Sequence, residues 1–111
     1  MALGEYTTDT VLGAVDHAVS GIGDDRQTVT TAGTRVALAS STTAKLVIIT
    51  AETDNTDYIV VGGATVVASL ATRRGTPLNP GDSITLEIDD LGDVYLDSMV
   101  NGEGVTFTYL T

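Results

Sequence analysis

The alternation of apolar and polar positions divides this chain near residue 26. From Gln27 onward, apolar residues alternate with polar ones or form short runs, and turn-forming residues separate these segments at intervals of roughly ten residues. This pattern is typical of short strands in an all-β sandwich or barrel. We therefore predict an antiparallel sandwich over residues 26–111, with about seven to eight strands in a jelly-roll-like arrangement.

The expected strands cover residues 27–31, 34–39, 44–51, 57–61, 64–70, 83–88, 93–99 and 105–111. Residues 46–49 are apolar throughout, which indicates a strand covered on both sides. Strict alternation in the last third predicts the core-facing side chains Ile84, Leu86, Ile88, Val105, Phe107 and Tyr109.

Glycine and proline mark the expected turns. Gly62-Gly63 is a hairpin signal between residues 57–61 and 64–70. Residues 77–82 contain two prolines and a Pro-Gly step, which predict a rigid turn. Asn101-Gly102 predicts a tight hairpin turn before the last strand.

Residues 1–25 form a separate N-terminal arm in this interpretation. Val11, Leu12, Val15, Ala18 and Val19 recur near helical spacing, which indicates a short amphipathic helix or an extended arm. Residues 21–25 are rich in Gly and Asp and predict a flexible, charged break. The arm either binds another chain or packs on its own sandwich, and the pattern does not decide between these roles.

Composition narrows the classes of function. The chain has 111 residues, which suits one domain, and it has no cysteine for a disulfide or a thiolate metal site. It contains neither an apolar run of about 20 residues for a membrane span nor the features of a signal peptide. Fifteen acidic residues face five basic ones, and this net charge of −10 argues against nucleic acid and anionic membranes as partners.

The acidic residues are mostly aspartate, eleven of fifteen, and Lys45 is the only lysine. A large net charge is tolerated best where salt screens it, so this balance favours a protein that works in high salt. The alternative is an ordinary acidic, soluble domain.

No catalytic set accompanies the strands. His17 is the only histidine, and no G-x-S-x-G motif is present for a nucleophile. Gly62-Gly63 and the pair Gly102 and Gly104 do not open a helix, as a phosphate-binding loop would. We therefore predict that the chain is not an enzyme and carries no cofactor.

The densest acidic cluster contains Asp89, Asp90, Asp93 and Asp97. Asp89, Asp90 and Asp93 are candidate ligands for a hard cation, but their spacing does not match a calcium-binding loop. Paired carboxylates for glycoside hydrolysis are a second possibility. We favour a solvated turn whose aspartates cap backbone N–H groups, and the same alternatives apply to Glu52, Asp54 and Asp57.

Arg73 and Arg74 form the only local positive spot in the sequence. They could dock an acidic neighbouring subunit through bidentate pairs, or they could bridge to carboxylates of the chain itself. The candidate partner-binding residues are therefore Val11, Leu12, Val15, Val19, Arg73 and Arg74.

Several segments carry a resemblance to a known class of protein. They are TAGT at 31–34, VII at 47–49, YIVVGG at 58–63, PLNPGDS at 77–83, DVYLD at 93–97 and NGEGV at 101–105. Residues 28–111 resemble small structural proteins encoded among the virion genes of tailed viruses of bacteria and archaea. The resemblance does not cover the N-terminal arm, and it brings no catalytic motif.

This resemblance implies a capsid decoration, head-fibre or tail-associated component. The expected function is that of a capsid decoration or accessory protein on the virion surface. It would bind the major capsid protein and form a homo-oligomer, with a trimer favoured. The alternative is a receptor- or glycan-binding module of a tail or fibre, for which Tyr58, Tyr95 and Tyr109 are the candidates. A polysaccharide hydrolase would rest only on the acidic cluster.

Overall fold

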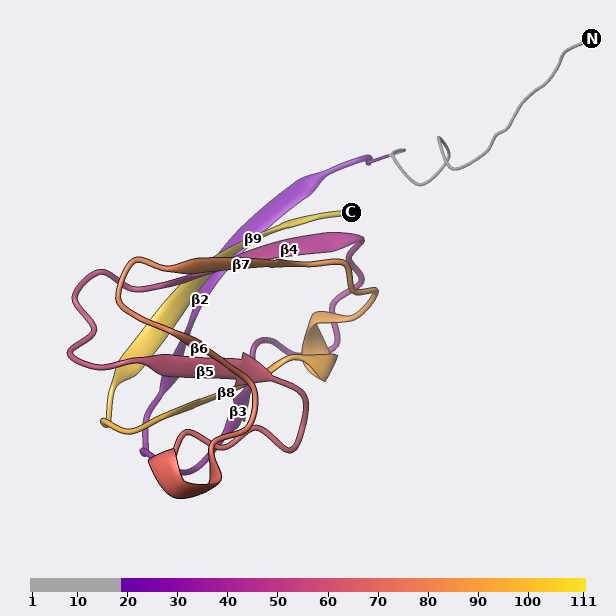
Figure 1. Ribbon diagram of the computed structural model, residues 1–111. Helices are drawn as coiled ribbons and strands as arrows, with labels where there is room; N and C mark the ends of the chain where they lie inside the picture. Colours follow the sequence, from indigo (N-terminus) through magenta and orange to yellow (C-terminus); the bar gives the residue numbers. More distant parts are fainter. Residues whose placement is uncertain (1–18) are drawn as a thin grey trace, which may run out of the picture.

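The computed structural model describes residues 19–111, which form two four-stranded antiparallel sheets packed on each other (Figure 1). The first sheet has the order β2 (Ile22–Val29), β9 (Glu103–Leu110), β4 (Leu46–Ala51) and β7 (Ser83–Leu86). The second has the order β3 (Val36–Ala37), β8 (Tyr95–Ser98), β5 (Ile59–Gly62) and β6 (Thr76–Leu78). Two short 3-10 helices, η2 (Leu70–Thr72) and η3 (Leu91–Asp93), lie in the connections. The predicted all-β sandwich is confirmed.

The main core lies between the two sheets. Ile49 of β4 is directly opposite Phe107 of β9 and Ile84 of β7, and the first two of these side chains are almost fully buried. Burial of one such side chain contributes about 1.5–3 kcal/mol. The remaining predicted core-facing residues are also confirmed: Val105 is buried, and Leu86, Ile88 and Tyr109 pack against the core while partly exposed.

The prediction that residues 46–49 are covered on both sides is wrong. Ile48 is 41% exposed, because its side chain points to the outer face of the first sheet, while Val47 and Ile49 point to the core. An apolar run in sequence therefore does not distinguish a buried strand from one with an open, partly apolar outer face.

The expected flexible break at residues 21–25 is also wrong, because β2 begins at Ile22 and pairs with β9 along its whole length. Gly and Asp are poor strand formers, but pairing with a long neighbouring strand overrides this preference. Gly23 has a specific role, since a Cβ atom there would overlap the ring of Tyr109. The sandwich therefore starts before the predicted boundary at residue 26, and most of the predicted arm lies outside the described residues.

Residues 64–70, predicted as a strand, belong to a loop that covers the outer face of the second sheet. Val66 and Ala68 in this loop pack on Val60 of β5 and form a small second core. The strand beside β5 is β6 instead, so the Gly62-Gly63 hairpin prediction is wrong. Pro77 lies within β6, at the edge of the sheet, where a missing N–H does not interrupt the ladder.

The Asn101-Gly102 turn is present, but it does not form a hairpin. It connects β8 of the second sheet to β9 of the first, so the flanking strands do not pair with each other. Gly102 has a φ of 86°, a left-handed conformation that favours glycine. The Asn-Gly signal thus predicts the turn correctly and the pairing incorrectly.

Candidate interaction surface

The two outer faces of the sandwich differ. The loop over residues 63–75 covers the second sheet, whereas no segment of residues 19–111 covers the outer face of β2, β9, β4 and β7. The register places mostly hydroxyl side chains on this open face. They are Thr50, Ser83, Thr85, Thr106 and Thr108.

One end of the open face is apolar. Leu110 of β9 lies opposite both Ile22 of β2 and Leu46 of β4, and Ile48 follows Leu46 on the same face. We call these four residues the apolar row. Ile22 is 72% exposed and Ile48 is 41% exposed, and the other two are half-buried. Contiguous apolar side chains on a polar face are typical of an interaction site.

An ion pair lies farther along the same face. The Arg26 guanidinium donates through Nε and Nη2 to the two carboxylate oxygens of Glu52, with Nη2–Oε1 at 3.0 Å. This bidentate pairing raises the pKa of Arg26. The sequence offers Glu52 as a candidate cation ligand, paired carboxylate or backbone cap, and it does not bring this residue to Arg26, which lies 26 positions earlier.

The acidic cluster is divided by the fold. Asp90 caps η3: its carboxylate accepts the N–H of Gly92 at 2.8 Å, the N–H of Thr42 at 3.0 Å and the hydroxyl of Ser41 at 2.9 Å. These hydrogen bonds lower the pKa of Asp90, and the bond from Gly92 has the largest effect. Capping is the role that we favoured for this turn.

Asp97 departs from the solvated-turn interpretation, because it is buried on β8 with 2% exposure. Asp89 and Asp93 are exposed, and the cluster therefore does not converge on one point. Among residues 19–111, no three His, Cys, Asp or Glu side chains are grouped so that they could hold a metal ion.

The predicted partner-binding residues are not brought together. Val19 is 44% exposed beside the start of β2, and Val11, Leu12 and Val15 lie outside the described residues, as does His17. The two arginines lie on the covering loop of the other sheet.

Arg73 lies over the ring of Tyr58, with its guanidinium carbon 5.1 Å from the ring centroid. Arg74 exchanges two backbone hydrogen bonds with Val67, at 2.9 and 3.1 Å, so its main chain shapes the loop. The ion pair between Arg26 and Glu52 involves neither of these arginines.

The three tyrosines proposed for glycan binding do not form one cluster. Tyr58 and Tyr95 pack against the small second core, and the Tyr58 hydroxyl donates to the carbonyl of Ala68. Tyr109 packs against the main core, beside Phe107. A platform of three aromatic rings is therefore not present.

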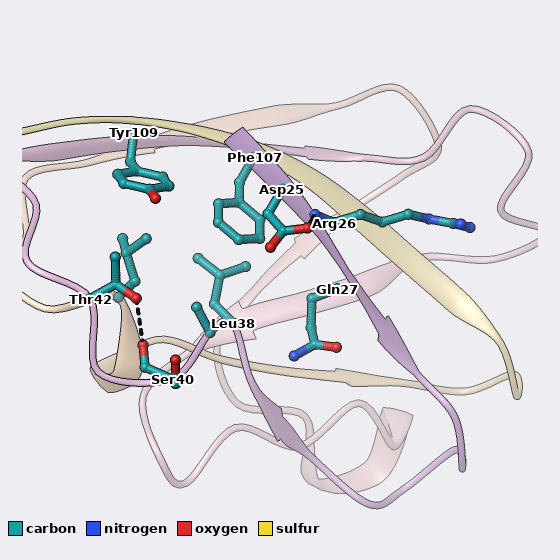
Figure 2. A pocket seen from close by; sticks show the side chains of 10 residues that line it. Asp25, Arg26, Gln27, Leu38, Ser40, Thr42, Phe107 and Tyr109 are labelled. Atoms are coloured by element: carbon teal, nitrogen blue, oxygen red, sulfur yellow. Dashed lines mark hydrogen bonds between the residues drawn. The ribbon is translucent and has the colours of Figure 1, made fainter. Parts of the chain in front are cut away.

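A hollow opens at one side of the sandwich, between β2 and the segment after β3. Its volume is about 270 Å³. Figure 2 shows Phe107 and Tyr109 side by side on one wall, Leu38 near the centre, and the Arg26 side chain pointing away. Sequence reasoning did not find this site, since its residues come from four separate segments: 25–27, 38–42, 91 and 107–109.

None of the helices in residues 19–111 is long and apolar enough to cross a membrane. Scans against known protein families, against curated proteins and against solved structures found no match to this chain. The interaction surface must therefore be interpreted from its own chemistry and from the resemblance stated above.

Proposed function

We propose that this chain is a virion structural protein of the capsid decoration or accessory type, which binds the major capsid protein as a homo-oligomer, with a trimer favoured. The apolar row on the open face carries this proposal. A decoration protein needs a stable surface complementary to a shell or to its own copies, and an exposed apolar group rimmed by polar residues provides one. The resemblance of residues 28–111 to virion proteins is the reason for proposing the major capsid protein as the partner.

The position of the row adds a second argument. Ile22 lies three residues after Val19, where the described part of the chain begins, so the row and the predicted apolar arm are close in sequence. A partner that contacts one of them could contact both. Among the strands that the structure describes, β2 has a neighbour on one side only, and oligomerisation is a common way to cover such an edge.

The proposal is tested with the double variant Ile22→Ser/Ile48→Ser. Mass in solution and co-sedimentation with capsids of the major capsid protein from the same genome are the two measurements. We expect the wild type to be oligomeric and to co-sediment, and the double variant to lose co-sedimentation or self-association. Thr108→Ser, a conservative change on the same face, should behave as wild type. A wild type that is monomeric and absent from capsids would overturn the proposal.

A saline environment is part of the same proposal. It rests on the net charge of −10 and on the excess of aspartate over lysine. The Debye length falls from about 10 Å to about 3 Å between 0.1 M and 1 M salt, so self-repulsion weakens over this range. We expect the thermal midpoint to rise over this range of KCl. A midpoint that stays constant or falls would contradict the saline interpretation.

A further inference from the structure

The hollow beside β2 lies where the two sheets of the sandwich separate. Within residues 19–111, β2 and β3 are the edge strands of their sheets, so no strand of this part of the chain closes the core on this side. With about 270 Å³, the hollow is slightly smaller than sites for drug-sized ligands, which take roughly 300–1,000 Å³. One long side chain is an occupant of suitable size.

The inner wall of the hollow is apolar and aromatic. Leu38, Leu91 and Phe107 are at most 3% exposed, and they border the hollow from beneath. Tyr109 lies beside Phe107, with ring centroids 6.2 Å apart. Because these three side chains are almost fully buried, an occupant of the hollow contacts them little, whereas the half-buried Tyr109 ring is accessible and can attract a cation.

The rim presents oxygen atoms. The register puts Asp25 opposite Phe107, on the inner face of β2, and one oxygen of its carboxylate accepts the N–H of Arg26 at 2.8 Å. The second oxygen of Asp25 and the hydroxyl of Tyr109 have no hydrogen-bond partner among residues 19–111. Ser40 adds a further hydroxyl group, and the Thr42 hydroxyl, which donates to the carbonyl of Ser40 at 2.9 Å, can still accept a hydrogen bond.

The side-chain nitrogen groups near the rim, those of Arg26 and Gln27, already donate hydrogen bonds elsewhere. The Gln27 amide nitrogen donates to the carbonyl of Ala37 at 2.7 Å, while the Gln27 amide oxygen accepts the N–H of Thr28 at 3.0 Å. Arg26 turns away from the hollow to Glu52 (Figure 2). Among the described lining residues, an anion would therefore meet the Asp25 carboxylate and only the paired cation of Arg26, whereas a cation would meet acceptors and the Tyr109 ring.

From this chemistry we propose that the hollow is a socket for one lysine or arginine side chain of a protein partner. The identity of that partner rests on the proposed function, but the socket itself does not. The charged group lies between the Asp25 carboxylate and the Tyr109 ring. A neutral sugar could also use hydroxyls and an aromatic ring, but it would gain nothing specific from the Asp25 charge.

The test is an NMR titration of the ¹⁵N-labelled protein at low salt with N-acetyl-arginine methylamide. The glutamine analogue serves as a neutral probe, and methyl glucoside represents a sugar. We expect weak, saturable shifts at the amides of Asp25, Ser40 and Tyr109 with the arginine probe only. Asp25→Asn should weaken this binding about fivefold or more, because it removes the charged acceptor.

Asp24→Asn is the matched control, since it removes the same charge from the opposite face of β2, where Asp24 lies opposite Thr108. It should leave the titration within about twofold of wild type, because exposed charges outside the site contribute little. Equal losses in both variants, shifts with methyl glucoside alone, or no shifts at the three amides would each overturn the socket.

Capsid co-sedimentation separates the two proposals. Asp25→Asn should reduce co-sedimentation while the oligomeric state stays as in wild type. If the NMR titration fails and capsid binding still depends on Ile22 and Ile48, the socket is wrong and the proposed function stands. If the titration succeeds but the wild type does not bind capsids, the socket stands and its partner is another basic protein.

Discussion

The buried carboxylate of Asp97 accepts the backbone N–H of Ala68 at 2.9 Å, which joins strand β8 to the loop over the second sheet. Its other oxygen accepts the N–H groups of Gly33 at 3.1 Å and Ser98 at 2.9 Å. One side chain therefore satisfies three backbone donors from three segments. The Asp97 carboxylate and the packing of Val66 on Val60 therefore both hold the loop on the outer face.

Asp97→Asn should lower the free energy of unfolding by about 2–3 kcal/mol. The amide nitrogen of asparagine would face a backbone N–H, so at least one buried donor would lose its acceptor, and such a loss costs about 1–3 kcal/mol, with more for charged groups. The chain has no Trp, so urea unfolding followed by far-ultraviolet circular dichroism is the suitable measurement.

Glu103→Gln is the matched control for that experiment. Glu103 is also buried, but its Oε1 alone accepts the N–H groups of Thr56 at 2.8 Å and Asp57 at 2.9 Å. Glutamine keeps an oxygen for both donors, so we expect a loss below about 1 kcal/mol. If both variants lose the same stability, the cost reflects removal of a buried charge and not the unsatisfied donors.

Gly75→Ala should also destabilise the covering loop. Gly75 has a φ of 112°, and a Cβ atom there would lie 2.7 Å from Cγ1 of Val60 and 2.8 Å from the carbonyl oxygen of Val61. Both the backbone conformation and the close contact oppose alanine, so the unfolding free energy should fall by about 2–3 kcal/mol. Thermal unfolding would show this as a clear fall in the midpoint.

Two other glycines separate these effects. Gly102 has a φ of 86° with open space around its Cα, so Gly102→Ala reports the conformational cost alone, about 1 kcal/mol. Gly63 also faces open space and has no positive φ, so Gly63→Ala should be nearly neutral. A Gly75→Ala variant no worse than Gly102→Ala would mean that the loop moves away without cost.

Stability should fall on acidification partly through Asp90. Its pKa is lowered in the folded state by hydrogen bonds from Gly92, Thr42 and Ser41, relative to about 3.9 in an unfolded chain. On acidification, the unfolded state therefore binds a proton at Asp90 before the folded state does. The contribution of Asp90 to the unfolding free energy is complete above about pH 4, and it is lost as the pH falls through the pKa of Asp90 in the folded state. Urea midpoints between neutral and acidic pH provide the measurement.

In Asp90→Asn this pH-dependent contribution is absent, so the midpoint should be lower than that of wild type at neutral pH and should fall less on acidification. Asp89→Asn controls for the loss of one negative charge from the same turn. An Asp90→Asn variant with the same acid-induced loss as wild type would show that the capping bonds do not depend on ionisation.

The fold was predictable where local pattern and tertiary pairing agree. The alternation of Ile84 and Leu86 gives β7 and its buried side directly, and Asn101-Gly102 gives a turn. The pattern could not identify β6, because Pro77 is read as a turn residue unless the edge position of the strand is known. It also could not show that Val66 packs on Val60 outside the sheet, since an apolar residue on a strand and one on a covering loop look alike in sequence.

The candidate surface was mostly hidden from the sequence for a similar reason. Ile22, Leu46 and Leu110 become neighbours only through the register of β2, β9 and β4. The sequence pattern places Asp25 in a flexible break. Only the pairing of Asp25 opposite Phe107 shows that its side chain lies on the inner face of β2, beside the hollow. Long-range pairing, which no local pattern encodes, therefore creates both proposed contact sites.

Ile48 and Ile49 provide the clearest separation of binding from stability, because adjacent residues on β4 point to opposite faces. Ile49 is fully buried, and Ile49→Ala should cost about 2–5 kcal/mol through lost burial and the cavity that remains. Ile48 is 41% exposed in the apolar row, so Ile48→Ser should change the unfolding free energy by less than about 1 kcal/mol. The same change should weaken self-association or capsid binding, measured by sedimentation at equal protein concentration. An Ile48→Ser variant that unfolds like Ile49→Ala would mean that the outer face is covered in the protein as it exists in solution.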